Sequence, residues 1–211
     1  MGYILPAVFV AAMTGVDLRP LPPGEVQNYI NRSSNAIDKF CGWSFGPNGT
    51  FTEKVSSNAY GRAQIDSSGF LSIYPIQVHP INSFISLTWI VRTPSQPNTK
   101  TLITPSTVMA NDVDVDTDSW GDGYRIRVYE DFSSFRDPGI PTQFTLSYNG
   151  GYVVTPTWLE EATIRWTAGM LKQRGAQAAV MTGTGGMVDV SAIGSDIVRA
   201  QEILSMYQRK F

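Results

Sequence analysis

The sequence predicts an α+β fold: a helical bundle of one N-terminal helix and two C-terminal helices, with an inserted antiparallel β-rich block. Apolar residues recur at helical spacing towards both ends of the 211-residue chain. Between Trp43 and about Val154, glycine, proline, asparagine and serine separate short alternating runs, which is typical of antiparallel strands. We therefore expect an arm at residues 1–23 and a single domain at 24–211, divided into a helix (24–42), the β-rich block (43–155) and two helices (157–175 and 195–211).

The N-terminal segment Tyr3–Met13 is the longest apolar run of the chain. It is too short to span a bilayer, and no basic region precedes it as in a signal peptide. Pro6 either begins a short helix that ends by Gly15, or the segment is an extended arm, and the sequence leaves both alternatives open. We expect a protein that is made in the cytoplasm and does not contact a membrane.

The first predicted helix covers Gly24–Cys41, and Gly42 stops it. One face follows the helical period through Val26, Ile30, Ser33, Ile37 and Phe40, and all of these except Ser33 are apolar.

Alternation predicts the main strands of the β-rich block. Ile81–Val91 reads as one long strand, and Arg125–Glu130 and Thr142–Tyr148 alternate in the same way. Asp66–Gly69 is typical of a turn, and Asn149–Gly151 turns the chain towards the next helix.

The second predicted helix, Thr157–Gly175, carries its own start and stop signals. Thr157 and Glu160 form a capping box, and Gly175 is a natural residue just past a helix end. Its apolar residues form two adjacent strips, so we expect it to pack on two sides; the strips are Leu159, Ala162, Trp166 and Met170, and Ile164, Ala168 and Leu171.

A glycine-rich stretch, Ala176–Ala192, is predicted to be a flexible loop. The last helix is predicted over Ser195–Phe211, with Ser195 as its N-cap. Its apolar stripe is Ile197, Ala200, Leu204, Tyr207 and Phe211.

Composition narrows the class of function. Charged residues make up only 16% of the chain, below the usual quarter, which indicates a component of an assembly with surface covered by partners. The net charge of −2 argues against a strongly basic nucleic-acid binder. The single cysteine, Cys41, cannot form an intramolecular disulfide, and the single histidine, His79, cannot build a multi-histidine metal site.

The most notable cluster of candidate site residues is acidic: Asp112, Asp114, Asp116, Asp118 and Asp122. Its spacing begins like an EF-hand calcium loop, but Ser119 and Arg125 stand where that loop needs glycine and glutamate. Strict alternation with valine favours a solvated edge strand. Such a patch can also line a surface that faces DNA phosphates without binding them.

No catalytic constellation emerges, so we expect neither an enzyme nor a bound metal or cofactor. His79 lacks an acid or nucleophile nearby in the sequence. Glu160 and Glu161 project about 100° apart on a helix, which is unsuitable for paired acid–base work.

Several short motifs resemble the head–tail connector (adaptor) proteins of tailed bacteriophages. Ala36–Phe45 is similar to the end of the family's first helix, although Trp43 stands where the family often has arginine. Phe70–Tyr74 followed by Pro80–Ser83 resembles the family's strand, Pro-Ile-x-Ser and second strand, and Tyr148–Tyr152 resembles its entry into the long helix. Ile203–Arg209 is similar to its C-terminal helix. The β-rich block is longer than in a minimal connector, so Arg92–Phe135 is expected to be an added hairpin.

The resemblance implies a structural protein of the virion neck. Its copies, commonly twelve, would form a ring that binds the portal protein, extends the channel for double-stranded DNA and joins the capsid to a tail or tail-completion protein. We expect the last helix to supply the portal or subunit interface, through Leu204, Tyr207, Arg209, Lys210 and Phe211. The expected channel-facing residues are Asp112, Asp114, Asp116 and Asp118.

Two other classes remain open. One is a different tail component, such as a terminator or baseplate protein. The other is a calcium- or carbohydrate-binding β module that would use the acidic run and the tryptophans.

Overall fold

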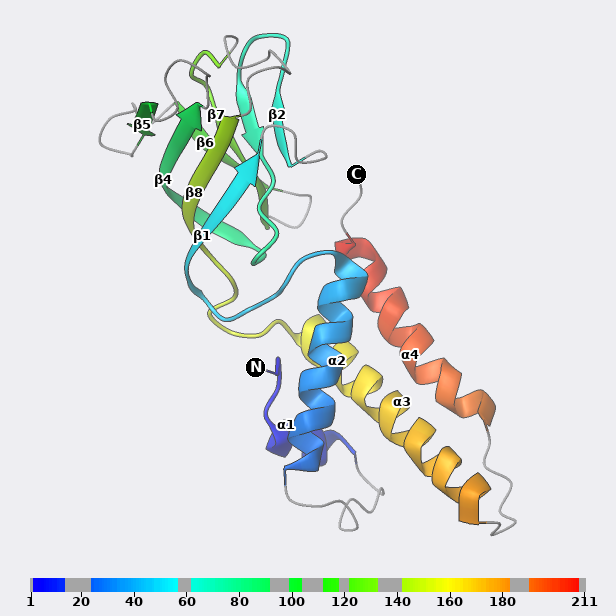
Figure 1. Ribbon diagram of the computed structural model, residues 1–211. Coiled ribbons are helices and arrows are strands. Elements are labelled where there is room, and N and C mark those ends of the chain that lie inside the picture. Colours follow the sequence, from blue (N-terminus) through cyan, green and yellow to red (C-terminus); the bar gives the residue numbers. More distant parts are fainter. Residues whose placement is uncertain are drawn as a thin grey trace. The chain divides into compact units, whose positions relative to one another are not determined.

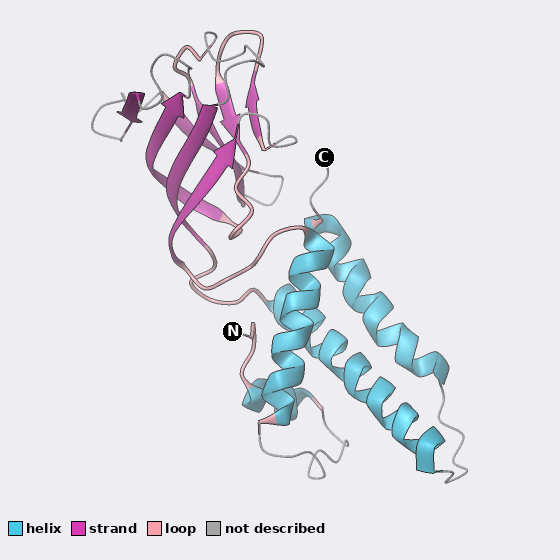
Figure 2. Ribbon diagram, viewed as in Figure 1, coloured by secondary structure: helices cyan, strands magenta, loops and turns pink. Residues whose placement is uncertain are grey.

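The computed structural model describes residues 2–13, 24–56, 62–91, 99–103, 112–117, 122–132, 142–182 and 190–208. The chain divides into two compact units. Both ends of the chain, Met1–Ser44 and Val154–Lys210, form the helical unit, and Phe45–Val153 forms the β unit (Figures 1 and 2).

The predicted fold class is wrong in its architecture. The chain is α+β, but its described residues form four α-helices and eight strands in two antiparallel sheets, not a helical bundle with an inserted block. Arg92–Phe135, expected as an added hairpin, supplies β5 (Thr99–Ile103) to one sheet and β6 (Val113–Thr117) and β7 (Gly123–Val128) to the other. Because each sheet buries the apolar face of the other, the β unit forms around a core of its own.

A short helix, α1 (Pro6–Ala12), forms near the N-terminus, with proline in its first turn. Of the two alternatives for this segment, the helix beginning at Pro6 is therefore the one observed. Phe9 is the buried residue of α1, and it packs in a cluster with Ile4, Ile30 and Ala168.

The next helix, α2 (Glu25–Cys41), confirms the prediction. It buries Ile30 and Ile37 of the expected stripe. It ends at Gly42, whose φ of 84° is left-handed and whose N–H donates to the carbonyl oxygen of Asp38 at 2.8 Å.

The long helix α3 (Thr157–Thr182) starts where predicted and packs against both α2 and α4, as its two apolar strips predict. Its predicted end at Gly175 is wrong, because the helix continues to Thr182. A glycine inside a helix costs only about 1 kcal/mol relative to alanine, and the alanine-rich residues that follow favour the helix.

The last helix, α4 (Val190–Leu204), begins before the predicted cap, so Ser195 lies inside it. A short 3₁₀ turn, η2 (Ser205–Tyr207), follows it. The predicted loop at Ala176–Ala192 is therefore wrong at both ends, where the chain is helical, and residues 183–189 lie outside the described residues.

The first sheet of the β unit has the strand order β1-β8-β4-β5, with β1 (Gly49–Ser56), β8 (Thr142–Gly150) and β4 (Ile81–Val91) joining β5. The second has the order β2-β3-β7-β6, with β2 (Ala63–Ile65) and β3 (Leu71–Ile73). The prediction of a strand at Ile81–Val91 is confirmed, and β7 and β8 lie close to their predicted positions.

The two sheets share one apolar core. Its fully buried members include Val55, Phe144 and Leu146 from the first sheet and Ile73 and Ile126 from the second. These residues occupy alternate positions in their strands, which is the pattern of a sheet with one buried face.

Candidate functional site

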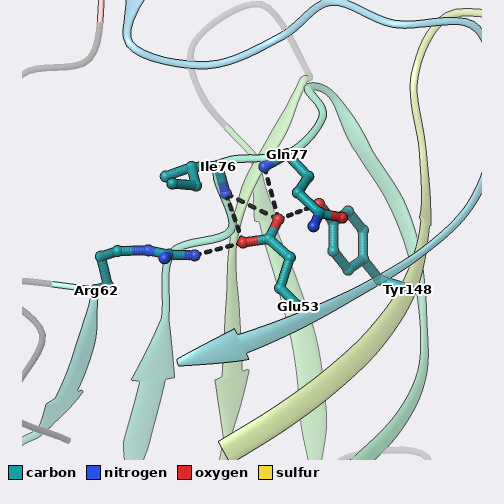
Figure 3. A network of polar contacts seen from close by, with 5 residues as sticks. All are labelled: Glu53, Arg62, Ile76, Gln77 and Tyr148. Carbon is teal, nitrogen blue, oxygen red and sulfur yellow. Dashed lines mark hydrogen bonds and ion pairs between the residues drawn. The ribbon is translucent and has the colours of Figure 1, made fainter. Parts of the chain in front are cut away.

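A buried carboxylate, that of Glu53, is the centre of a polar network in the β unit (Figure 3). Glu53 shares the inward face of β1 with Val55, and its side chain is only 3% exposed. Its Oε1 accepts hydrogen bonds from Tyr148 Oη at 2.6 Å and from Gln77 N at 2.7 Å. The N–H of Ile76 donates to both oxygens, at 3.0 and 3.1 Å, and Arg62 forms an ion pair with Oε2.

This network fixes the segment that follows β3 against β1 and β8. Every donor around Glu53 comes from another part of the chain: Arg62 precedes β2, Ile76 and Gln77 follow β3, and Tyr148 lies on β8 (Figure 3). Burial, reinforced by the hydrogen bond to Glu53, raises the pKa of Tyr148 far above its usual range. With both oxygens engaged by the protein, the carboxylate acts as a structural anchor.

This network is not predicted from the sequence, although one signal for it is present there. Phe51, Glu53 and Val55 alternate along one strand, which places a glutamate on an apolar face. A charged residue at such a position needs a partner, since an unpaired buried charge is costly.

A second polar group surrounds His79, which is buried. The fold brings Asp122 near this histidine, with Oδ2 3.9 Å from His79 Nε2, and Tyr152 Oη donates to the same oxygen at 2.5 Å. The ring of Phe45 packs edge-on against the imidazole, with the two ring centroids 5.7 Å apart. The sequence alone gave no sign of this acid, because Asp122 lies far along the chain from His79.

Two residues of the acidic run, Asp114 and Asp116, lie on β6, at the edge of the second sheet, and Asp112 directly precedes this strand. Asp114 is paired in register with Arg127, and Asp116 with Arg125. Arg125 Nε donates to Asp116 Oδ2 at 2.5 Å, and Arg127 approaches the same oxygen at 3.2 Å. The prediction of an edge strand is confirmed for Asp114 and Asp116, whereas Asp118 lies outside the described residues.

A strand through Thr117 does not have the loop geometry of an EF-hand. Within the described ranges, no three histidine, cysteine, aspartate or glutamate side chains gather in the manner of a metal site.

A bulge in β7 adds one aromatic residue, Tyr124, next to Arg125 in the second sheet. Asp116 pairs with Arg125 and Thr117 with Gly123, so Tyr124 is the extra residue. Tyr124 and Arg125 therefore lie beside Tyr74, and the Arg125 guanidinium is 5.6 and 5.8 Å from the two tyrosine ring centroids. Arg127 lies over Tyr129 at 5.8 Å. We call this surface the Arg–Tyr face; its members are Tyr74, Tyr124, Arg125, Arg127 and Tyr129.

Two of the residues expected at a portal or subunit interface are described: Leu204 ends α4, and Tyr207 lies in η2. Leu204 and Tyr207 are buried within the helical unit, and the Tyr207 ring stacks on Trp158, with centroids 3.7 Å apart and planes 8° from parallel. Arg209, Lys210 and Phe211 lie outside the described residues. Their part in an interface stays a prediction.

Large apolar side chains are exposed elsewhere on the helical unit. Leu5, at the N-cap of α1, and Val8 and Val10, within the helix, are 68%, 38% and 50% exposed. On α4 and η2, Val198 and Met206 are exposed. A groove of about 430 Å³ runs along α3 of the same unit; its lining includes Ala12, Thr157, Ile164, Ala168 and Lys172.

No protein-family model matches the sequence, and no curated protein matches it. Among the described residues, no helix combines the length and the apolar character that crossing a membrane requires.

Proposed function

We propose that this chain is a structural virion protein of a tailed bacteriophage: a head–tail connector whose copies form a ring beneath the portal. The ring would extend the DNA channel and join the capsid to a tail or tail-completion protein. One observation carries the proposal, namely an uncharged helix, α1, whose large apolar side chains are exposed. In a chain with only 16% charged residues, such a surface is typical of a subunit interface.

Two of the motifs that resemble the connector family lie at joints between elements, which supports the proposal. Cys41 and Gly42 end α2, and Gly42 has the left-handed backbone that favours glycine. Tyr148–Tyr152 leads from β8 towards α3 through Gly151, whose φ is +89°. A side chain at Gly151 would also collide with Pro47, since a Cβ there would lie 2.5 Å from its carbonyl oxygen. The backbone conformations at positions 42 and 151 therefore favour glycine, which is the residue type on which the resemblance depends at both positions.

We further propose that β6 faces the DNA channel. Asp114 is exposed, whereas Asp116 is neutralised by two arginines. Asp114 is thus the stronger candidate for a carboxylate that keeps passing phosphates from adhering.

The test is the mass of the purified protein in solution, measured by native mass spectrometry with and without a candidate portal protein. We expect a closed multi-subunit ring that binds the portal. A chain that neither associates with itself nor binds any portal tested would overturn the proposal.

The C-terminal residues can be tested by truncation. A truncation after Gln208 removes Arg209, Lys210 and Phe211 but keeps the stack of Tyr207 on Trp158. We expect it to lose portal attachment while retaining its helical content. A truncation after Met206 is the matched comparison, because it also removes that stack and should reduce stability as well.

The Arg–Tyr face favours a second candidate, a carbohydrate-binding β module. Tyrosine rings offer flat faces to the C–H groups of a sugar, and guanidinium and carboxylate groups supply donors and acceptors for its hydroxyls. Glycan binding that is lost in Tyr124→Ala, with no portal binding by the parent chain, would favour this module. Thermal melting that is unchanged by a chelator would exclude its calcium-dependent form.

A further inference from the structure

α1 exposes large apolar side chains on either side of its buried residue, Phe9. None of its residues from Pro6 to Ala12 carries a charge or a polar side chain, yet only Phe9 is buried. A helix that is apolar on all sides is normally covered on all sides. The exposed Leu5, Val8 and Val10 therefore require a second surface.

Contacts within its own chain fix α1 in place, independently of any such second surface. Phe9 packs in the cluster with Ile30 and Ala168. The backbone of Tyr3 is bonded on both sides, with its N–H donating to Ser34 Oγ at 3.1 Å and its carbonyl oxygen accepting from Thr155 Oγ1 at 3.1 Å. A helix fixed in this way loses little conformational entropy on docking.

The groove along α3 has the matching chemistry. Its apolar lining consists of Ile164 and the largely buried Ala168 on α3, together with Ala12 and Met13 at the end of this chain's own α1. Its charged lining residues are largely paired within the chain: Arg165 Nη2 lies 2.6 Å from Glu161 Oε1, and Lys172 Nζ lies 2.5 Å from Asp196 Oδ2. An occupant need not supply a charge, and α1 brings none.

The length of the groove also agrees. A seven-residue helix is about 10 Å long, and the stretch of α3 between Thr157 and Lys172 is about 22 Å long at 1.5 Å per residue. The groove is therefore long enough for α1 of another copy to lie in it.

We propose that α1 of one copy of this chain docks in the α3 groove of the next copy. The two surfaces differ, so the contact is heterologous: each copy offers α1 to one neighbour and its groove to the other. Repetition of such a contact closes into a ring when the rotation allows it, and this inference rests on the proposed function by naming the surfaces that join the subunits.

Disulfide trapping between two single variants tests the contact. Val8→Cys supplies the helix, and Thr157→Cys or Lys172→Cys supplies an end of the groove. Mixing the two variants makes any bond between Val8→Cys and a groove cysteine intermolecular. The native Cys41 does not interfere, because burial, with a smaller contribution from Asp38, raises the pKa of its thiol to about 12.

After oxidation with diamide, we expect a covalent dimer from the mixture of Val8→Cys with at least one groove variant. Gln173→Cys is the matched control, since it is exposed beside Lys172 but does not line the groove. A dimer formed by Val8→Cys alone, or equal trapping by Gln173→Cys, would overturn the proposal.

An equilibrium measurement complements the trapping. The double variant Leu5→Ser/Val10→Ser should raise the dissociation constant for self-association about tenfold or more. Val153→Ser/Val154→Ser is the control, because these valines are 82% and 79% exposed but lie outside α1.

The outcomes separate the two proposals. A chain that assembles and binds the portal, but whose assembly ignores the α1 variant, overturns the docking inference and leaves the connector proposal intact. A variant that assembles normally and loses only portal binding assigns α1 to the portal and overturns the inference. A chain that stays monomeric with and without the portal overturns both.

Discussion

Glu53 ties the segment containing Ile76 and Gln77 to β1, and this role can be measured. In Glu53→Gln, the amide group cannot accept all the hydrogen bonds that the two carboxylate oxygens accept, and Arg62 loses its counter-ion. We expect the free energy of unfolding to fall by roughly 1–3 kcal/mol, measured by urea denaturation. The control Glu202→Gln, at an exposed position on α4, should stay within about 0.5 kcal/mol of the parent. An unchanged Glu53→Gln would contradict the anchoring role.

Tyr148 gives the β unit a dependence on alkaline pH. Burial, and secondarily the hydrogen bond to Glu53, raises its pKa in the folded state well above the unfolded value of about 10. Above about pH 10 the unfolded chain therefore releases this proton while the folded chain keeps it. The contribution of the Tyr148 proton to the free energy of unfolding is fully present below about pH 10. It falls as the pH rises, by up to about 1.4 kcal/mol per pH unit.

The matched variant for this prediction is Tyr148→Phe. It should be less stable than the parent at pH 8 but should lose stability less steeply between pH 10 and 11, as measured by urea unfolding. Equal slopes for the two proteins would contradict the prediction. The other tyrosines are present in both proteins and cancel in the difference.

At the scale of the element, η2 packs against the helical unit through the ring of Tyr207. Tyr207 is buried and stacks on Trp158 of α3. Replacing Tyr207 with alanine should destabilise the helical unit by about 3–5 kcal/mol, whereas Tyr207→Phe keeps the stack and should cost far less. Circular dichroism at 222 nm during thermal unfolding measures both, and similar losses in the two variants would show that the hydroxyl, not the stack, is what matters.

Local signals predicted one helix start and one helix end, and missed one of each. The structure confirms the helix start at Thr157 and the helix end at Gly42, and at the start the N–H of Glu160 donates to the carbonyl oxygen of Pro156 at 3.0 Å. Gly175 resembles an equally good stop, but its helical penalty is small and Ala176–Thr182 offsets it. Ser195 resembles a cap, yet α4 begins earlier, because a serine is tolerated inside a helix that is stabilised by packing.

The strand pattern identified β4 and β8, but it could not assign strands to sheets. Which strands pair depends on contacts between residues far apart in the chain, such as Ile73 with Ile126. The same limitation hid the groups around Glu53 and His79, whose partners come from distant segments. The acidic edge strand was predictable because strict alternation is a local property.

At the scale of the whole molecule, two separate cores predict two unfolding events. The β unit is built around residues such as Ile126 and Leu146, and the helical unit includes the cluster around Phe9 and Ile30. Differential scanning calorimetry should therefore resolve two transitions. Glu53→Gln should lower the temperature of one, and Tyr207→Ala that of the other. A single transition that both variants shift equally would contradict this prediction.

The chain enters and leaves the β unit at the same end. Gly49, at the start of β1, pairs with Gly150 at the end of β8, and the N–H of Asn48 donates to the carbonyl oxygen of Tyr152 at 3.1 Å. Tension applied through the two connections would thus peel β1 from β8 and break their hydrogen bonds one after another, instead of shearing them all at once. A β unit attached in this way unzips at low force, so in the proposed connector any large mechanical load would have to be carried by the helices.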